Sequence, residues 1–215
     1  MGEGKKHTPG HHERWGPPVA EPTLHAGITV AELVENFAGS AYNARRLGNA
    51  VKIWAEALQG GARVYLTLAG AMTPAGLRKM IGQLVREGLV HAVISTGANL
   101  AHDAQSGARP GSLIQGSELA DDAVLREQKV FRIYDIFVRD DLWDTYTSEV
   151  QSRIIPELTR ARAGSASIVA PSEIFRVLGE DLAARGDDGI LASCAKAGVR
   201  VYSPAIMDSD WGIRI

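Results

Sequence analysis

Residues 64–95 have the sequence VYLTLAGAMTPAGLRKMIGQLVREGLVHAVIS, and this stretch decides the fold class. Apolar runs at 64–68 and 92–95 have the length and composition of strands, and the first is expected to be buried on both faces. Between them, apolar residues recur at helical spacing after Thr73, which suits an N-cap, and Pro74, which suits the first helical position. Strand, small-residue loop, helix and strand form a βαβ unit, whose two strands are parallel.

Residues 1–27 differ from the rest of the chain. They contain four prolines, several glycines and the histidines His7, His11 and His12, so we expect an extended arm that packs over a neighbouring subunit. The histidines lack the regular spacing of a structural metal site, and no metal is predicted. The sequence therefore predicts an arm over 1–27 and an α/β domain over 28–215.

The other predicted elements alternate between helix and strand. Apolar stripes indicate helices over 29–37, which Thr29 caps, and over 47–58. Further on we expect a long loop at 107–118, strands at 130–138, 167–170 and 199–202, and helices at 142–161, from Ser172 to 182, and at 188–197. This alternation favours a doubly wound, mostly parallel, Rossmann-like sheet. The last residues, 211–215, leave an apolar end and an open edge, so the sheet looks incomplete at its carboxyl end.

Composition excludes several classes of partner. The 215 residues carry 23 basic and 25 acidic side chains, a net charge of −2 that gives no reason to expect nucleic acid or an anionic membrane. No apolar run approaches the ~20 residues that span a bilayer. The one cysteine, Cys194, cannot form an internal disulfide, so a reducing cytoplasmic setting is expected, with Cys194 as a buried apolar residue.

Ligands of open α/β sheets bind at the carboxyl ends of the strands. Three such ends carry small or polar residues here, at 69–74, 95–99 and 204–212. The helix that opens at Pro74 would aim free N–H groups at a phosphate. However, the spacing from Gly70 to Gly76 is not the G-x-G-x-x-G fingerprint, so pattern alone leaves a nucleotide site and simple tight turns equally open.

Titratable residues follow two of these strand ends. His102, beside Asp103, is either a general base or polar substrate contact, or part of a surface or helix-capping pair. Asp208 and Asp210 either hold a cationic amine or form an ordinary acidic turn. Trp211 either supplies an aromatic face for a cation or belongs to the core.

Several segments together resemble the deoxyhypusine synthase family, including its bacterial relatives and the related homospermidine synthases. The resemblance runs in order from about residue 28 to the end of the chain. It is carried by the segments FAGSAYNA (37–44), LAGAMTPAGL (68–77), STGANL (95–100) with HD (102–103), PSEIF (171–175) and YSPA (202–205) with DS (208–209).

This resemblance implies a reaction and a cofactor. The family uses NAD as an internal redox cofactor while the aminobutyl group of spermidine passes through an enzyme lysine to a lysine or amine acceptor. By position, the resemblance implies that NAD is contacted by Gly70, Ala71, Met72, Thr73, Pro74, Ser95, Thr96, Gly97 and Asp208. His102 stands where eukaryotic members have a glutamate that touches cofactor and amine, and Ile213 where they have an amine-binding aspartate. Both departures favour another polyamine as substrate, with His102 as the candidate catalytic residue and His102 and Asp210 as substrate contacts.

The family nucleophile is expected downstream of this chain, whose last lysine is Lys196. Three alternatives follow: the carboxyl half is supplied to make a complete enzyme, a second chain completes the fold, or the chain is a non-catalytic NAD-binding paralogue or regulatory subunit. The resemblance also implies a homotetramer with active sites between subunits.

Overall fold

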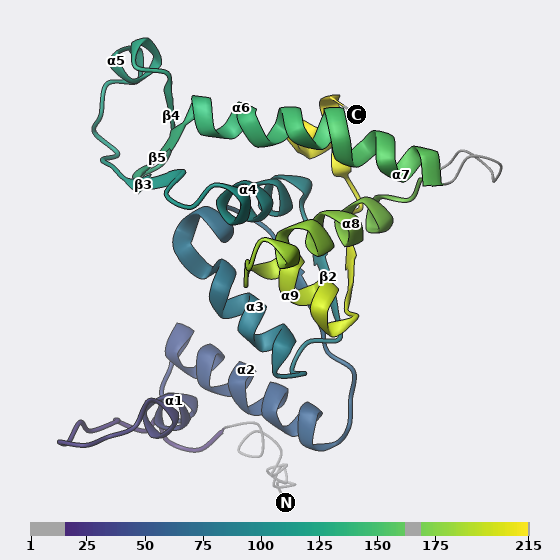
Figure 1. Cartoon of the computed structure of the whole chain (residues 1–215). Helices are drawn as coiled ribbons and strands as arrows, with labels where there is room; N and C mark the ends of the chain where they lie inside the picture. The colour runs from purple at the N-terminus through teal and green to yellow at the C-terminus, as the bar shows by residue number, and fades with distance from the viewer. Residues whose placement is uncertain (1–15, 162–168, 215) are drawn as a thin grey trace, which may run out of the picture. The chain divides into compact units, whose positions relative to one another are not determined.

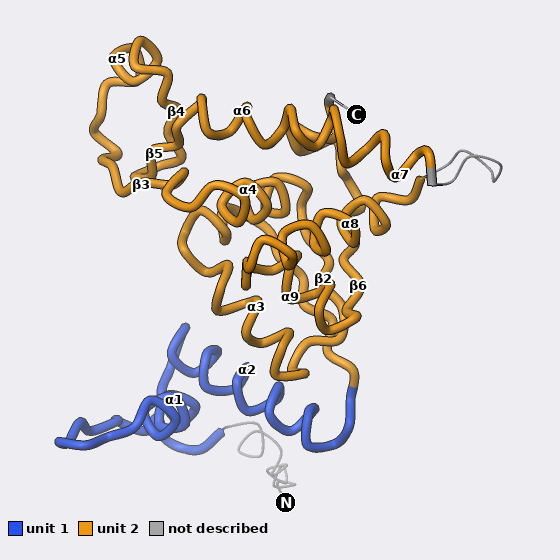
Figure 2. Tube along the Cα trace, in the orientation of Figure 1, with its two compact units in different colours: residues 1–62 blue, residues 63–215 orange. Residues whose placement is uncertain are grey.

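The computed structural model describes residues 16–161 and 169–214, and its chain forms two compact units, residues 1–62 and 63–215 (Figure 2). Three histidines of the predicted arm, His7, His11 and His12, lie outside the described residues, whereas Nε2 of His25 lies 3.1 Å from the Glu32 carboxylate. Within the arm, residues 16–25 have no regular secondary structure. In the part of the chain that the structure describes, no helix combines the length and apolar character needed to cross a membrane.

Unit 1 contains a pair of helices, α1 (Val30–Ala38) and α2 (Tyr42–Gln59). The hydroxyl oxygen of Thr29 accepts a hydrogen bond from the amide of Glu32 at 3.1 Å, which confirms the predicted N-cap. Gly48 permits close packing of the two helices, since a Cβ there would lie 2.4 Å from the backbone nitrogen of Ala38.

Unit 2 is built on a parallel sheet of β1 (Tyr65–Leu68), β2 (Ala92–Ser95) and β6 (Arg200–Tyr202), in the order β1-β2-β6. Helices α8 (Pro171–Ala184) and α9 (Ile190–Ala197) pack against β6, and α3 (Arg78–Arg86) packs against α9 (Figure 1). The fold is therefore mixed α/β, as predicted.

Helices cover one face of this sheet. Val93 and Val201 are buried, whereas Tyr65 and Tyr202, whose side chains point to the other face, are 64% and 39% exposed. The expectation that the strand at 64–68 is buried on both faces is wrong, because Tyr65 and Thr67, which share one face, are both exposed among the described residues.

A second, antiparallel sheet consists of β3 (Leu113–Gln115), β4 (Val130–Ile133) and β5 (Ile136–Arg139), in the order β3-β5-β4, with α5 (Asp122–Glu127) between β3 and β4 in the chain. The single strand predicted over 130–138 is wrong: it folds back at residues 134–135, where neither glycine nor proline signals a turn. The loop predicted over 107–118 is wrong in its middle, since β3 pairs there with β5.

The helix predicted over 142–161 is present and starts earlier, as α6 (Asp140–Glu149), η3 (Val150–Ile154) and α7 (Ile155–Ala161), which continue into one another (Figure 1). Of the strand predicted over 167–170, residues 167 and 168 lie outside the described residues, and 169 and 170 have no regular structure. Ser172 does not cap α8, which begins at Pro171 after extended Ala170. The chain closes with η4 (Ile206–Asp208) and α10 (Asp210–Arg214).

Candidate functional site

The three parallel strands end side by side. Leu68 pairs with Ser95, and Ile94 pairs with Tyr202, so the loops after β1, β2 and β6 start from one edge of the sheet. All the candidate cofactor residues lie in or beside these loops. This edge is where open α/β sheets bind ligands.

Buried polar atoms gather at this edge without hydrogen-bond partners among the described residues. They are the side-chain oxygens of Thr73, Ser95 and Ser203 and the amide nitrogen of Asn99. The side-chain oxygen of Asn99 accepts from the backbone amide of Thr73 at 3.2 Å, which ties the loop after β1 to the helix after β2. Buried polar groups are normally paired, so unpaired ones concentrated at the ligand-binding edge indicate a polar ligand.

The loop after β1 is shaped by its backbone. Gly70 has a φ of 74°, in the left-handed region that favours glycine, and a helical turn, η2 (Thr73–Leu77), follows. Thr73 is therefore inside η2, and its predicted N-cap role is wrong: Met72 precedes the turn, and the Thr73 hydroxyl caps nothing. Gly70, Ala71 and Met72 are exposed, while Thr73 and Pro74 are buried at the base of the loop.

Gly97 and Asp208 meet directly. The amide of Gly97, the first residue of α4 (Gly97–Ala108), donates to the Asp208 carboxylate at 2.6 Å, and Thr96 is the N-cap. A Cβ at position 97 would lie 2.5 Å from that carboxylate oxygen, so any larger residue there would have to displace Asp208. Asp208 thus occupies the helix N-terminus that a phosphate would otherwise use, and its exposed carboxylate can also accept hydrogen bonds from ligand hydroxyls.

His102 lies on α4 against an aromatic ring. Its imidazole packs on Trp143 of α6, with ring centroids 4.6 Å apart, and its Nδ1 is buried without a partner among the described residues. Burial lowers the pKa of His102 to about 4, so the ring is neutral at pH 7. A base with so low a pKa accepts protons weakly, which favours a contact role over general-base chemistry.

Asp103 does not join its neighbour. It points into the interior, where it accepts hydrogen bonds from Arg78 at 2.9 Å and from the backbone amides of Ile190 at 2.9 Å and Leu191 at 2.7 Å. Adjacency of His102 and Asp103 in the sequence therefore does not make a pair. The role of Asp103, in an ion pair that holds three helices, was missed because nothing in its local sequence marks it.

Asp210 reaches the same neighbourhood as His102. Its carboxylate accepts from Trp143 Nε1 and from the Thr147 hydroxyl, each at 3.3 Å, and Gln105 donates to Thr147 at 2.8 Å. Trp143 therefore contacts both predicted substrate residues, His102 and Asp210. Its place on an amphipathic helix does not by itself mark it as a site residue.

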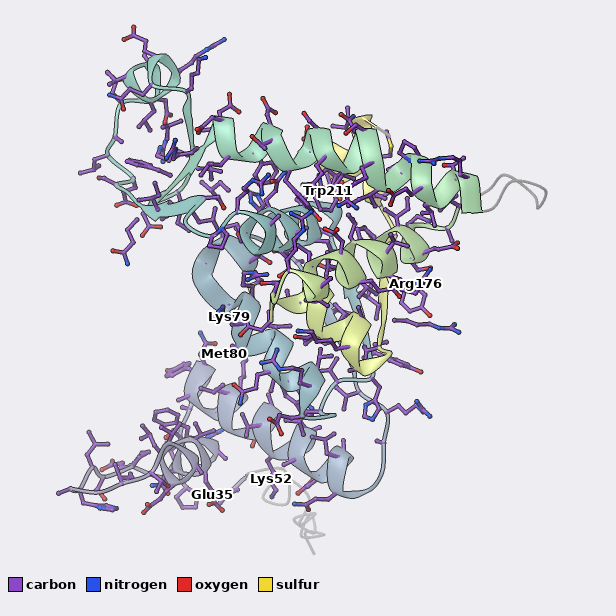
Figure 3. The ribbon with its side chains drawn as sticks, in the orientation of Figure 1. Glu35, Lys52, Lys79, Met80, Arg176 and Trp211 are labelled. Atoms are coloured by element: carbon purple, nitrogen blue, oxygen red, sulfur yellow. The ribbon has the colours of Figure 1, made fainter. Side chains whose placement is uncertain are left out.

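Trp211 belongs to the core rather than to a cation site. Trp211, labelled in Figure 3, is 1% exposed. It lies edge-on to Tyr146, with ring centroids 6.3 Å apart. Within residues 16–161 and 169–214, no group of three or more histidine, cysteine or carboxylate side chains has the arrangement of a metal site.

Three comparisons bear on this arrangement. The model of the family described as deoxyhypusine synthase matches residues 32–215. The chain belongs to the deoxyhypusine synthase family. The match includes every candidate residue at the strand ends.

Two archaeal relatives agree with the family model. The probable deoxyhypusine synthase 1 of Archaeoglobus fulgidus is 34% identical over 197 residues, which is 92% of this chain and 62% of the relative. The probable deoxyhypusine synthase 1 of Methanosarcina mazei is 35% identical over 201 residues, 92% of this chain and 59% of the relative. The chain thus spans about 60% of the length of these curated deoxyhypusine synthases.

A crystal structure of an Entamoeba histolytica protein named as a deoxyhypusine synthase shares the fold. Its TM-score is 0.61 at 17% sequence identity, and the superposition covers 87% of this chain and 62% of the other. At that identity the likeness supports the fold alone.

Proposed function

We propose that this chain supplies the NAD-binding part of an enzyme that transfers the aminobutyl group of spermidine, or of a related polyamine, to a lysine or amine acceptor. Membership of the deoxyhypusine synthase family supports the reaction class. In this proposal the parallel sheet is part of a doubly wound, Rossmann-like sheet, and the enzyme is cytoplasmic. It works as a homotetramer or with a second chain that completes the fold.

The observation that carries the cofactor proposal is the set of unpartnered polar atoms at the strand ends. The hydroxyls of Thr73, Ser95 and Ser203 would exchange their unpaired state for hydrogen bonds to NAD. Gly70, Ala71, Met72 and Pro74 would let the cofactor approach the backbone of the first loop. When bound, NAD would supply the hydride acceptor and donor of the reaction.

The hydroxyl groups of the cofactor would be bound through hydrogen bonds at Thr96, Gly97 and Asp208. The Gly97 amide holds one Asp208 oxygen at 2.6 Å, which fixes the carboxylate at the end of β6. A carboxylate repels phosphate and accepts from hydroxyls, so Asp208 would orient a ribose rather than a pyrophosphate.

His102 and Asp210 would contact the amine substrate. Neutral His102 offers a hydrogen-bond acceptor without repelling a cationic polyamine, and Asp210 contributes negative charge. Trp143 would hold both, through its ring on one side and its Nε1 on the other.

The first experiment measures NAD binding to the full chain by isothermal titration calorimetry, comparing Ser95→Ala and Ser203→Ala with the unaltered protein. Removing a buried hydroxyl that has no protein partner should leave stability unchanged or slightly raised, while NAD binding weakens by about five- to tenfold. Ser152→Ala is the matched control, because Ser152 is exposed in η3, outside the proposed site, and its hydroxyl donates to the Ser148 carbonyl at 2.7 Å.

No binding of NAD to the unaltered chain would overturn the cofactor proposal. NAD binding without NADH fluorescence on addition of spermidine or putrescine, even with a complementing carboxyl-terminal chain, would favour the non-catalytic paralogue or regulatory subunit.

A further inference from the structure

A cavity of about 940 Å³ lies between the loop after β1 and the β4–β5 hairpin. One wall contains Ala71, Thr73 and Pro74, which belong to the proposed cofactor site. The opposite wall contains the hairpin residues 133–136, for which the proposed function gives no role. The cavity therefore extends the proposed site toward an element that has not yet been accounted for.

The tip of this hairpin holds an aromatic residue in a backbone conformation that side chains rarely adopt. Ile133 pairs with Ile136, so the connection is the two residues Tyr134 and Asp135, and Tyr134 has a φ of 59°. Glycine is the usual residue at such a position. Tyr134 is 73% exposed, so core packing does not explain why a large side chain stands there.

The turn is braced rather than loose. Arg132 Nη1 donates to the carbonyl of Tyr134 at 2.8 Å. The same guanidinium donates to both carboxylate oxygens of Asp122, at 2.8 and 3.0 Å. On the other side, the amide of Gly116 donates to the carbonyl of Asp135 at 2.7 Å. These bonds fix the backbone of the turn that carries Tyr134, which is one of the residues that line the cavity.

The lining of the cavity suits a flat, hydrogen-bonding ring. The branched aliphatic residues Ile114, Ile133 and Ile136 line the cavity together with Tyr134. The hydroxyls of Thr73, Ser106 and Ser112, also in the lining, are buried without partners among the described residues. An aromatic face, apolar walls and a few unpaired hydroxyls are the usual composition of a site for a planar heterocycle.

We propose that Tyr134 stacks on the planar base of a nucleotide bound between the loop after β1 and the β4–β5 hairpin. This rests on the proposed NAD site, of which the cavity would hold one base. Stacking on a fixed ring accounts for both the exposure of Tyr134 and its strained backbone.

The test compares three variants of the full chain by calorimetric titration with NAD and by thermal unfolding. Tyr134→Gly should weaken NAD binding about tenfold, in line with the loss of one base–aromatic stack, and Tyr134→Phe should stay within about twofold. Lys129→Gly is the matched control, since Lys129 is exposed, has a φ of 56° and does not line this cavity. Both glycine variants should raise the melting temperature by about 2 to 4 °C, because each relieves a positive φ.

Tyr134→Gly is therefore expected to raise the melting temperature and to weaken NAD binding. Lys129→Gly should raise the melting temperature and leave NAD binding unchanged. Titration with AMP and with nicotinamide mononucleotide identifies the base: the affinity that depends on Tyr134 should follow one of them. Tight NAD binding that Tyr134→Gly leaves unchanged overturns this inference and leaves the cofactor proposal intact. Weakened polyamine binding with unchanged NAD binding also overturns it. Absence of binding by all three nucleotides overturns both.

Discussion

Arg78 and Asp103 form a buried ion pair that joins α3 to α4, with 2.9 Å between Nε and the carboxylate oxygen. Asp103 is fully buried and also accepts from the first two amides of α9, so one carboxylate ties three helices together. The Arg78 guanidinium also forms a second ion pair, with the Asp187 carboxylate, at 2.6 Å. A Cβ at position 189 would lie within 2.4 Å of the carbon of that guanidinium, so Gly189 leaves the space in which the pair forms.

Replacing Arg78 should destabilise the fold strongly. Arg78→Ala leaves the buried Asp103 carboxyl group without its cation, and breaking a buried ion pair in this way typically costs about 3 to 5 kcal/mol of unfolding free energy. Urea unfolding followed by circular dichroism measures this. Lys79→Ala is the control on the same helix (Lys79 is labelled in Figure 3): its ion pair with Asp188 at 3.0 Å is exposed, and its loss should cost no more than about 1 kcal/mol. Equal losses in both variants would contradict the role given to Asp103.

His102 should make stability depend on pH. Its pKa is about 4 in the folded chain, below the ordinary value of 6.5, because burial disfavours the charged ring. The unfolded chain therefore binds a proton that the folded chain does not between these two values. The contribution of neutral His102 to the unfolding free energy is therefore complete above about pH 6.5 and is lost as the pH falls toward 4. The total loss is up to about 3 kcal/mol.

The variant His102→Gln isolates this effect from the titration of carboxyl groups. Between pH 7 and pH 4 its unfolding free energy should fall less than that of the unaltered chain, by about 2 to 3 kcal/mol. Parallel pH profiles of the two proteins would show that His102 is not desolvated.

The βαβ core was predictable because strand and helix periodicities differ and Thr73-Pro74 marks a loop-to-helix change. The hairpin at 134–135 was not, since Tyr134 takes a positive φ at a turn position where glycine is the usual residue. The open face of the parallel sheet was missed for a related reason: apolar composition indicates burial but not which face is covered within one chain.

The location of the site could be predicted from the parallel strands alone, because parallel strands bring their carboxyl-end loops together whatever the loop sequences are. What pattern could not supply is which neighbours meet across the chain. Asp103 pairs with Arg78, not His102, and Trp143 links His102 to Asp210 over separations that no local spacing encodes.

Trp143 and Asp210 should be energetically coupled. Trp143→Phe removes the Nε1 donor while keeping a ring against His102, and Asp210→Asn removes the acceptor charge. Unfolding in urea of both single variants and the double variant gives a double-mutant cycle, in which a coupling energy of about 1 kcal/mol is expected for a hydrogen bond to a carboxylate. Additive losses would show that the 3.3 Å contact contributes nothing to stability.

Cys194 should be inert in the folded chain. It is 1% exposed, and burial raises the pKa of its thiol to about 12, so almost no thiolate exists at pH 8. Iodoacetamide should leave the native protein unlabelled by mass spectrometry over hours and modify it fully in urea. Because this is the only cysteine in the 215 residues, labelling also reports unfolding of α9 directly. Rapid labelling without denaturant would contradict the packing of that helix.

Gly97→Ala should disrupt the joint between α4 and the end of β6. The new methyl group would lie 2.5 Å from the Asp208 carboxylate and 3.0 Å from the carbonyl of Ile206, so Asp208 must move and the amide at 97 loses its acceptor. We expect a loss of about 1 to 2 kcal/mol in urea unfolding, together with weaker NAD binding. Gly16→Ala, which has no atom within 4 Å of the new Cβ, should change neither. The same Gly97→Ala change made in an Asp208→Ala background should cost less, because the clashing carboxylate is gone; an undiminished cost there would assign the effect to the helix backbone instead of to Asp208.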